Sequence, residues 1–314
     1  MKSIGVVIPC YMGGEITITL INNILKYADQ VVLVDDKCPL KTGKKVLKSD
    51  FGNKVHVIFN KTNLGVGGAT KVGFEWLMNS NCDIILKMDA DYQMNPKDIP
   101  KICAPIINKE YQSTKGNRFT NIEKLFEMPR VRLIGNTFLS YLCKFSTGYW
   151  EIFDPTNGFI AFSSESLREI DLKKTDDRFF FETDLLFRCS LKNITIKNIS
   201  IDANYNNNYS SLSPLKEIIP FLIKNTKLLI KRILYQYYLL DFNVGSIELI
   251  LSIFFGLSSL SFGLFLLIKS NLTYELTSAG TASIFTIFSI LSIQFFLSFI
   301  YYDCSIKVIL RKNN

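Results

Sequence analysis

Two long uncharged stretches near the C-terminus constrain this chain more than any other feature of its sequence. Leu249 to Ile268 is twenty residues without a charge, and Ala279 to Tyr302 is a second uncharged run, with Gln294 as its most polar member. Each stretch is long enough to cross a hydrocarbon core of about 30 Å. A helix buried inside a soluble protein is rarely apolar on every face, so both stretches are predicted to span a membrane.

The distribution of basic residues predicts which side of the membrane the rest of the chain occupies. Two crossings return the chain to its starting side. Lys269 is the only basic residue in the link between them. The chain has more basic residues outside the spans: Lys216, Lys224, Lys227, Lys231 and Arg232 before the first, and Lys307, Arg311 and Lys312 after the second. The positive-inside rule therefore predicts a cytosolic N-terminal part.

The basic segment before the first span also bears on partners. The formal net charge of the chain is +8, and much of the excess lies in this segment. No basic recognition helix or aromatic RNA-binding motif accompanies it, so we do not expect nucleic acid as a partner. Contact with anionic lipid head groups is the interpretation we favour, and a solvated helix face is the alternative.

The cysteines and the single histidine argue against a zinc site and against a disulfide scaffold. The chain has seven cysteines, none of them in a CxxC pair, and one histidine, His56, which we interpret as structural. Scattered thiols suit a reducing cytosol. The apolar run from Ile4 to Pro9 is too short for a signal peptide.

Short apolar runs alternate with helical patterns over the first hundred residues. Buried strands are predicted at Ile4 to Ile8, Val31 to Val34, Val55 to Phe59 and Ile84 to Leu86, and helices from about Gly13 to Ala28 and from about Ala69 to Met78. This order predicts an α/β fold with a mostly parallel, Rossmann-like sheet flanked by helices, in which ligands bind beyond the carboxyl ends of the strands. Residues 110–205 are less regular, and a late strand is expected from Ile194 to Ile201.

These patterns divide the chain into three expected parts. Residues 1–210 form the α/β domain, and residues 211–245 form amphipathic basic helices beside the membrane. Residues 246–314 form two transmembrane helices and a short basic tail.

Two acidic pairs lie at predicted strand ends. Asp89-Ala90-Asp91 places two carboxylates in a turn where both can face one cation, and Gln93 could add a neutral oxygen ligand. Such a set suits Mg²⁺ or Mn²⁺, which proteins hold through one or two carboxylates together with phosphate oxygens and water. Asp35-Asp36 closes the second strand, where a carboxylate can accept hydrogen bonds from a base N–H or from ribose hydroxyls. Helix capping is the alternative role for Asp89 and Asp91, and a plain turn is the alternative for Asp35 and Asp36.

A glycine-rich segment, Asn63 to Ala69, opens the second predicted helix. Glycines at such a position let the backbone approach a nucleotide or phosphate closely. The segment lacks the Gly-Lys-Ser/Thr of a P-loop and does not match GxGxxG, so by itself it does not identify a ligand.

The order of these segments, taken together, is more specific than any of them alone. The segments are Val7 to Tyr11, Asp35-Asp36, Asn63 to Ala69, Asp89 to Pro96, Lys115 to Phe119, Arg132 to Asn136, Asp154 to Gly158 and Phe181 to Leu186. Over roughly residues 4–205 the chain resembles family-2 glycosyltransferases, and more narrowly the dolichyl- or polyprenyl-phosphate sugar synthases. The resemblance implies a GT-A fold, a nucleotide-sugar donor and a divalent cation, and the paired C-terminal spans suit these enzymes.

The resemblance also implies roles for individual residues. Donor binding falls to the first strand and the loops around it, at Pro9, Tyr11, Glu15, Asp36, Asn63, Gly67 and Asp89. Asp89, Asp91 and Gln93 would hold the metal, although Tyr92 stands where such enzymes often have glycine. Arg118 and Arg132 look like the basic residues placed near an acceptor phosphate, which arginine contacts in a bidentate way. Asp184, beside Glu182, lies where inverting members often carry a catalytic carboxylate.

The leading hypothesis is an inverting transfer of one sugar from a UDP- or GDP-linked donor to a membrane polyprenyl phosphate. A lipid phosphate is already ionised, so Asp184 could position it rather than deprotonate it. The alternative enzyme extends a polysaccharide or lipid-linked saccharide with Asp184 as a true base, and a non-catalytic membrane scaffold is an alternative of another class. The sugar and the oligomeric state are left open, since the spans could pair across subunits.

Overall fold

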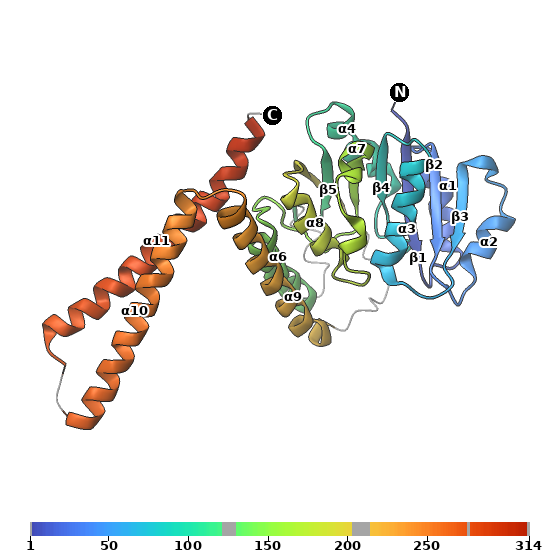
Figure 1. Ribbon diagram of the computed structural model, residues 1–314. Helices are drawn as coiled ribbons and strands as arrows, with labels where there is room; N and C mark the ends of the chain where they lie inside the picture. The colour runs from blue at the N-terminus through green and yellow to red at the C-terminus, as the bar shows by residue number, and fades with distance from the viewer. Residues whose placement is uncertain (1, 121–129, 203–213, 275–276, 313–314) are drawn as a thin grey trace. The chain divides into compact units, whose positions relative to one another are not determined.

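The computed structural model describes residues 2–120, 130–202, 214–274 and 277–312 (Figure 1). The chain divides into two compact units, Met1–Leu229 and Ile230–Asn314. Each unit has buried hydrophobic clusters of its own.

The N-terminal unit is built on a seven-stranded sheet with the strand order β3-β2-β1-β4-β6-β5-β7. Its strands are β1 (Ile4–Cys10), β2 (Gln30–Asp35), β3 (Val55–Phe59), β4 (Ile84–Lys87), β5 (Ser113–Asn117), β6 (Ile160–Ser163) and β7 (Ile196–Ser200). The first four strands are mutually parallel, β7 pairs in parallel with β5, and β6 runs antiparallel to both of its neighbours. The predicted α/β architecture and all five predicted strands are confirmed, with boundaries that differ by a few residues.

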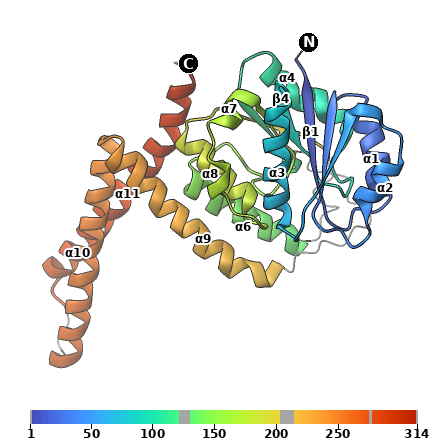
Figure 2. The same ribbon diagram turned by 45° about the vertical axis from the view of Figure 1, so that its right-hand side comes forward.

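The helices of this unit cover both faces of the sheet. They are α1 (Ile16–Ile24), α2 (Thr42–Lys48), α3 (Gly65–Asn79), α4 (Ile99–Ile107), α6 (Arg130–Thr147), α7 (Ser164–Arg168), α8 (Phe181–Leu191) and the start of α9 (Pro214–Leu234). Apolar side chains of α1 and α4 share one buried cluster, and those of α3 and α8 share another. Figure 2 shows α3 packed on one face of the sheet, running along the direction of the strands.

The alternation of side chains along β1 explains why this strand is apolar along its whole length. Val6 and Ile8 point into the cluster with α1 and α4, and Val7 points into the cluster with α3 and α8. A parallel strand that is buried on both faces therefore appears in the sequence as a continuous apolar run. Burying each such side chain stabilises the fold by about 1.5–3 kcal/mol before the cost in chain entropy.

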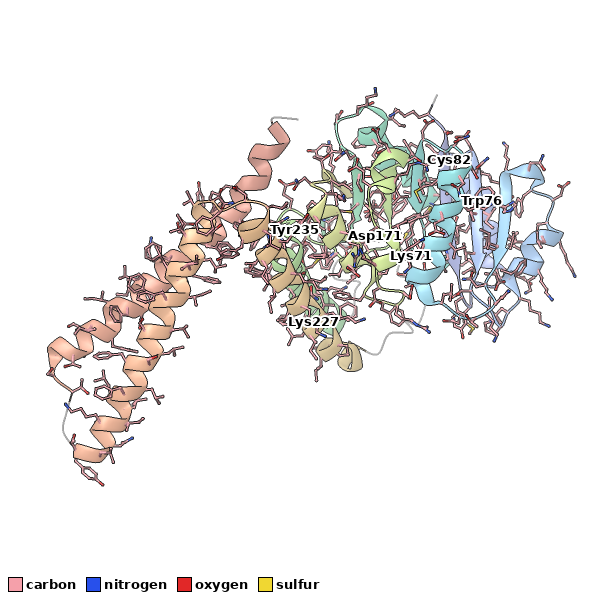
Figure 3. The ribbon with its side chains drawn as sticks, viewed as in Figure 1. Lys71, Trp76, Cys82, Asp171, Lys227 and Tyr235 are labelled. Carbon is pink, nitrogen blue, oxygen red and sulfur yellow. The ribbon has the colours of Figure 1, made fainter. Side chains whose placement is uncertain are left out.

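The first part of α9 has a buried apolar side and an exposed basic side. Phe221 and Leu228 are buried against Phe180 and Phe187 of the α8 region, while Lys227 is exposed (Figure 3). Lys224 pairs with Asp176 at 2.5 Å.

The second unit contains the end of α9, a π-helical turn at Tyr235–Leu239, and two long helices, α10 (Val244–Thr273) and α11 (Ala279–Lys312). The apolar windows of α10 and α11 have mean hydropathies of 2.2 and 2.0, and only 11% and 6% of their residues are buried. A core helix of a soluble protein would bury most of such a window. The two helices therefore have the length and the exposed apolar surface that crossing a membrane requires.

Serines join α10 to α11 along their contact. Ser252 and Ser292 each donate a hydrogen bond to the other's carbonyl oxygen, at 3.0 and 2.9 Å, and the hydroxyls of Ser259 and Ser289 lie 2.7 Å apart. Small hydroxyl residues let helices pack closely where no water competes for their hydrogen bonds. The two apolar helices thus form a specific hairpin.

A buried ion pair lies within the second unit. Arg232 Nη1 and Nη2 donate to the two carboxylate oxygens of Asp303 at 2.7 and 2.9 Å, and the Tyr237 hydroxyl donates to the same carboxylate at 2.7 Å. The arginine is 1% exposed and the aspartate 2%. The pair fastens the end of α9 to α11 through bidentate, charge-assisted hydrogen bonds.

Candidate active site

The carboxyl ends of β1, β2 and β4 meet at one edge of the sheet. Cys10 of β1 pairs with Asp35 of β2, and Val7 of β1 pairs with Lys87 of β4. The two acidic pairs therefore lie at the ends of β2 and β4, the strands on either side of β1. This edge is where ligands bind in open α/β sheets.

The residues expected near the donor surround this edge. Pro9 is buried at the end of β1, and Tyr11, just beyond it, is 56% exposed. Glu15 is the exposed residue before α1, where its Oε1 lies 3.4 Å from Lys45 Nζ. An exposed tyrosine beside a strand end can offer a face to a flat ring.

Asp36 organises the start of α3. Its Oδ1 accepts hydrogen bonds from Asn60 Nδ2 and from the Leu64 N–H, and its Oδ2 accepts one from the Gly65 N–H, all at 2.8 Å. These donors include amides that the first turn of a helix leaves without an intrahelical partner, and a carboxylate is the favoured charge there. The buried Asp36 thus fixes the loop 60–65 against β2.

The helix α3 begins at Gly65, four residues before the predicted start near Ala69. Gly65 has a φ of +87°, a conformation that glycine adopts without strain. A Cβ on Gly67 would lie 2.5 Å from the Asp176 carbonyl oxygen. The close approach that these glycines permit is to the chain's own segment 176–181, and Asn63 Oδ1 accepts a bond from Arg178 Nη1 at 2.9 Å.

The Asp89-Ala90-Asp91 turn follows β4. The Asp89 side chain is 31% exposed, and Asp91 Oδ1 accepts a hydrogen bond from the Gln93 N–H at 3.0 Å. Tyr92 has a φ of +61°, which explains why glycine suits this position. In this chain the tyrosine hydroxyl accepts a hydrogen bond from Asn23 Nδ2 at 2.9 Å, and the ring packs on the core.

The electrostatics of this turn fit a cation. Burial, and then the charge of Asp89, raises the pKa of the Asp91 carboxyl. A divalent cation would offset the repulsion between the two carboxylates. In the part of the chain that the structure describes, no cluster of three or more His, Cys, Asp or Glu side chains could hold a metal, so Gln93, phosphate and water would complete the ligand set.

Lys87, which the sequence did not single out, lies directly behind this turn. Its Nζ is 2.7 Å from Asp89 Oδ1 and 2.9 Å from Glu182 Oε1, and its side chain is fully buried. Burial alone would lower the pKa of Lys87, but the charges of Asp89 and Glu182 outweigh it and raise the pKa. A Cβ on Gly158 would overlap Lys87 Nζ and Asp89 Oδ2, so a larger residue there would displace these side chains.

The two acidic residues of α8 have different surroundings. Glu182 reaches the Asp89 turn through Lys87. Asp184 accepts a hydrogen bond from the Asp176 N–H at 2.9 Å and lies 3.4 Å from Arg188. Burial raises the pKa of Asp184, although the Arg188 charge and the Asp176 N–H partly offset it. Of the two, Glu182 is the one in contact with Lys87.

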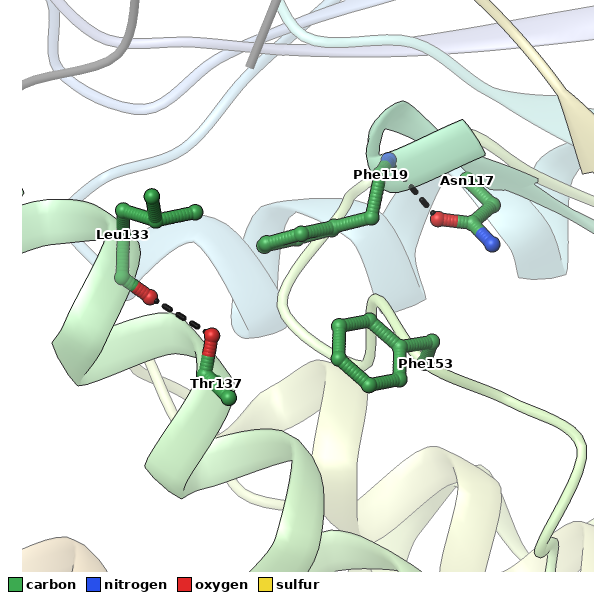
Figure 4. Close-up of a pocket in the computed structure, with 5 residues that line it drawn as sticks. All are labelled: Asn117, Phe119, Leu133, Thr137 and Phe153. Atoms are coloured by element: carbon green, nitrogen blue, oxygen red, sulfur yellow. Dashed lines mark hydrogen bonds between the residues drawn. The ribbon is translucent and has the colours of Figure 1, made fainter. Parts of the chain in front are cut away.

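Arg118 is held in a bidentate pair. Its Nε and Nη2 donate to the two oxygens of buried Asp154 at 2.7 and 2.8 Å. A pocket of about 400 Å³ lies beside it, lined by Asn117, Phe119, Leu133, Thr137 and Phe153 (Figure 4). Arg132 lies in α6 next to Leu133, and its side chain is outside the described residues.

Comparison with known proteins agrees with this architecture. A family model described as glycosyl transferase family 2 matches residues 5–171. A UDP-N-acetylglucosamine–dolichyl-phosphate N-acetylglucosaminyltransferase from Methanococcus voltae is 29% identical over 73% of this chain and 96% of its own length. A polyprenol monophosphomannose synthase from Mycolicibacterium smegmatis is 25% identical, over 62% of this chain and 75% of its own.

A solved structure shows the same fold. Glucosyl-3-phosphoglycerate synthase from Mycobacterium tuberculosis, crystallised with Mn²⁺, UDP and its product, superposes with a TM-score of 0.54 at 16% identity, over 74% of this chain and 80% of its own. The sheet is thus of the GT-A type, and the protein is a glycosyltransferase. It belongs to glycosyl transferase family 2.

Proposed function

We propose that this enzyme is membrane-anchored and transfers a sugar, with inversion, from a UDP- or GDP-linked donor to a polyprenyl phosphate. The observation that carries the proposal is the presence in one chain of a strand-end Asp pair and two exposed apolar helices. A donor site needs only the Asp pair. The two apolar helices, together with relatives that are named for dolichyl or polyprenol phosphate, support an acceptor that resides in the membrane.

The Asp89 turn would receive the donor diphosphate together with Mg²⁺ or Mn²⁺. When bound, the cation would neutralise charge on the departing nucleoside diphosphate. Asp89, Asp91 and Gln93 would hold it, and support for a cation comes from the repulsion between the two carboxylates described above. Asp36 would position the nucleotide indirectly, by fixing the loop that contains Asn63.

The acceptor would bind near Arg118. Its guanidinium group is fixed by Asp154, and an acceptor phosphate there would share the guanidinium with that carboxylate. The neighbouring pocket has aromatic walls, with Phe119 and Phe153 in edge contact at 5.1 Å between centroids. An anionic head group followed by an apolar prenyl chain matches a charged residue beside an apolar pocket.

The test uses membranes containing the protein, labelled UDP- and GDP-sugars, and undecaprenyl or dolichyl phosphate. Labelled lipid that forms with the wild type and is lost with Asp91→Ala supports both the reaction and the cation site. Sugar that reaches only saccharide or protein acceptors contradicts the lipid-phosphate acceptor, and an Asp91→Ala variant of full activity contradicts the cation site.

A saccharide acceptor is the second candidate, and the raised pKa of Asp184 is the observation that favours it. A buried carboxyl with a raised pKa suits general acid–base catalysis, which a sugar hydroxyl needs and an ionised phosphate does not. Asp184→Asn would abolish turnover in that case. With a lipid phosphate as acceptor, the same variant keeps measurable activity.

A further inference from the structure

Lys87 has no role in the reaction proposed above, yet it contacts the candidate metal site directly. Its ammonium group lies between Asp89 and Glu182 and is inaccessible to solvent. The Glu182 side chain is only 9% exposed, whereas that of Asp89 is 31% exposed. Asp89 thus has a permanent positive charge on its buried side and an accessible side toward the solvent.

This positive charge weakens the attraction of the turn for a metal ion. Two carboxylates attract a divalent cation, but an ammonium group in contact with one of them opposes it, and the opposition is strong where water is excluded. Among the described residues, no third acidic, histidine or cysteine side chain joins Asp89 and Asp91 in a group that could hold a metal ion. The protein alone therefore provides a weak site, and diphosphate oxygens would supply the missing negative charge.

We propose that Lys87 makes cation binding at Asp89 and Asp91 depend on the nucleoside diphosphate. The inference rests on the proposed function, because it takes a nucleotide as the donor. Lys87 acts through Asp89 and is a positioning residue, not a catalytic one. Glu182 keeps the ammonium group in place, and Gly158 leaves the room that the contact needs.

The experiment measures Mn²⁺ binding to the detergent-solubilised full-length protein from the electron paramagnetic resonance signal of free Mn²⁺, with and without UDP or GDP. Lys87→Met alone would leave Glu182 buried without a partner, so the test variant combines Lys87→Met with Glu182→Gln. Without nucleotide, this double variant is expected to bind Mn²⁺ roughly tenfold more tightly than the wild type, the scale on which groups that contact metal ligands alter affinity. The strengthening of Mn²⁺ binding by nucleotide should shrink by the same factor.

Two further variants separate charge from structure. Glu182→Gln alone leaves Lys87 with Asp89 as its single carboxylate contact among those described, so Mn²⁺ should bind more weakly than in the wild type. Lys115→Met is the matched control, because it also removes a buried lysine of this region, one whose Nζ donates to the Asn157 carbonyl instead. It should change Mn²⁺ affinity far less than the double variant does, because Lys115 Nζ contacts the Asn157 carbonyl rather than Asp89.

Opposite shifts in Glu182→Gln and in the double variant would support the proposal, since damage to the fold would weaken binding in both. A double variant that binds Mn²⁺ no more tightly than the wild type overturns it. If neither UDP nor GDP strengthens Mn²⁺ binding to the wild type, the donor assignment fails. The effect of the double variant on Mn²⁺ alone would still decide whether Lys87 opposes the cation.

Discussion

Replacing Asp36 by asparagine tests how the donor loop is held. The carboxylate accepts three hydrogen bonds at 2.8 Å, two of them from backbone N–H groups at the start of α3. Asparagine has one acceptor oxygen, and its NH₂ group would face a donor in either orientation. The variant loses at least one bond to a charged acceptor and leaves a buried N–H unpaired, so we expect it to be destabilised by about 3–5 kcal/mol.

The two tryptophans make this measurement specific to the N-terminal unit. Trp76 and Trp150 both lie within Met1–Leu229, so urea unfolding followed by tryptophan fluorescence reports that unit alone. Asp50→Asn is the control, because exposed Asp50 accepts a single bond from the Gly52 N–H at 3.3 Å, and it should change stability by less than about 0.5 kcal/mol. If Asp36→Asn unfolds with the same free energy as Asp50→Asn, the capping argument is wrong.

Two further predictions concern buried charges. Arg232→Met removes the guanidinium that contacts buried Asp303 and should destabilise the second unit by about 3–5 kcal/mol, whereas adding Asp303→Leu should recover part of the loss in detergent melting experiments. Burial lowers the pKa of Lys115 from 10.5 to about 8. Below pH 8 the folded state therefore contains a charged, buried Lys115, which destabilises it by the full amount of this shift. That cost disappears as the pH rises from about 8 to 10.5, and over this window the wild type should gain stability relative to Lys115→Met in urea titrations.

The sequence predicts most of the sheet because its parallel strands are buried on both faces. β1 is a continuous apolar run, as are most of β2 and β4, and the acidic residues at the end of β2 and just after β4 mark the ligand edge of the sheet. β5 is the exception. It is Ser-Thr-Lys-Gly-Asn, and its buried polar side chains have hydrogen-bond partners inside the protein: Ser113 donates to the Ala161 carbonyl and Thr114 to that of Ile102. No apolar pattern could have predicted this strand.

The buried ion pairs also could not be predicted from local sequence patterns. Lys87 and Glu182 are 95 residues apart in the chain, and Arg232 and Asp303 are 71 apart. A lysine that closes an apolar strand was the only local signal for the first pair. Arg232, in a basic run, was expected to face anionic lipid head groups, with a solvated surface as the alternative, whereas it is buried. Only the tertiary structure shows that each of these charges has a partner.

The acceptor is the central claim, and it is tested most directly by offering the purified enzyme two lipids that differ by one group. Polyprenyl phosphate and the free polyprenol of the same length are each incubated with labelled nucleotide sugar and Mg²⁺ or Mn²⁺. The account predicts a labelled lipid from the phosphate and none from the alcohol, with formation of the product lost in Asp91→Ala. Equal transfer to both lipids, or transfer only to an added saccharide, would contradict it.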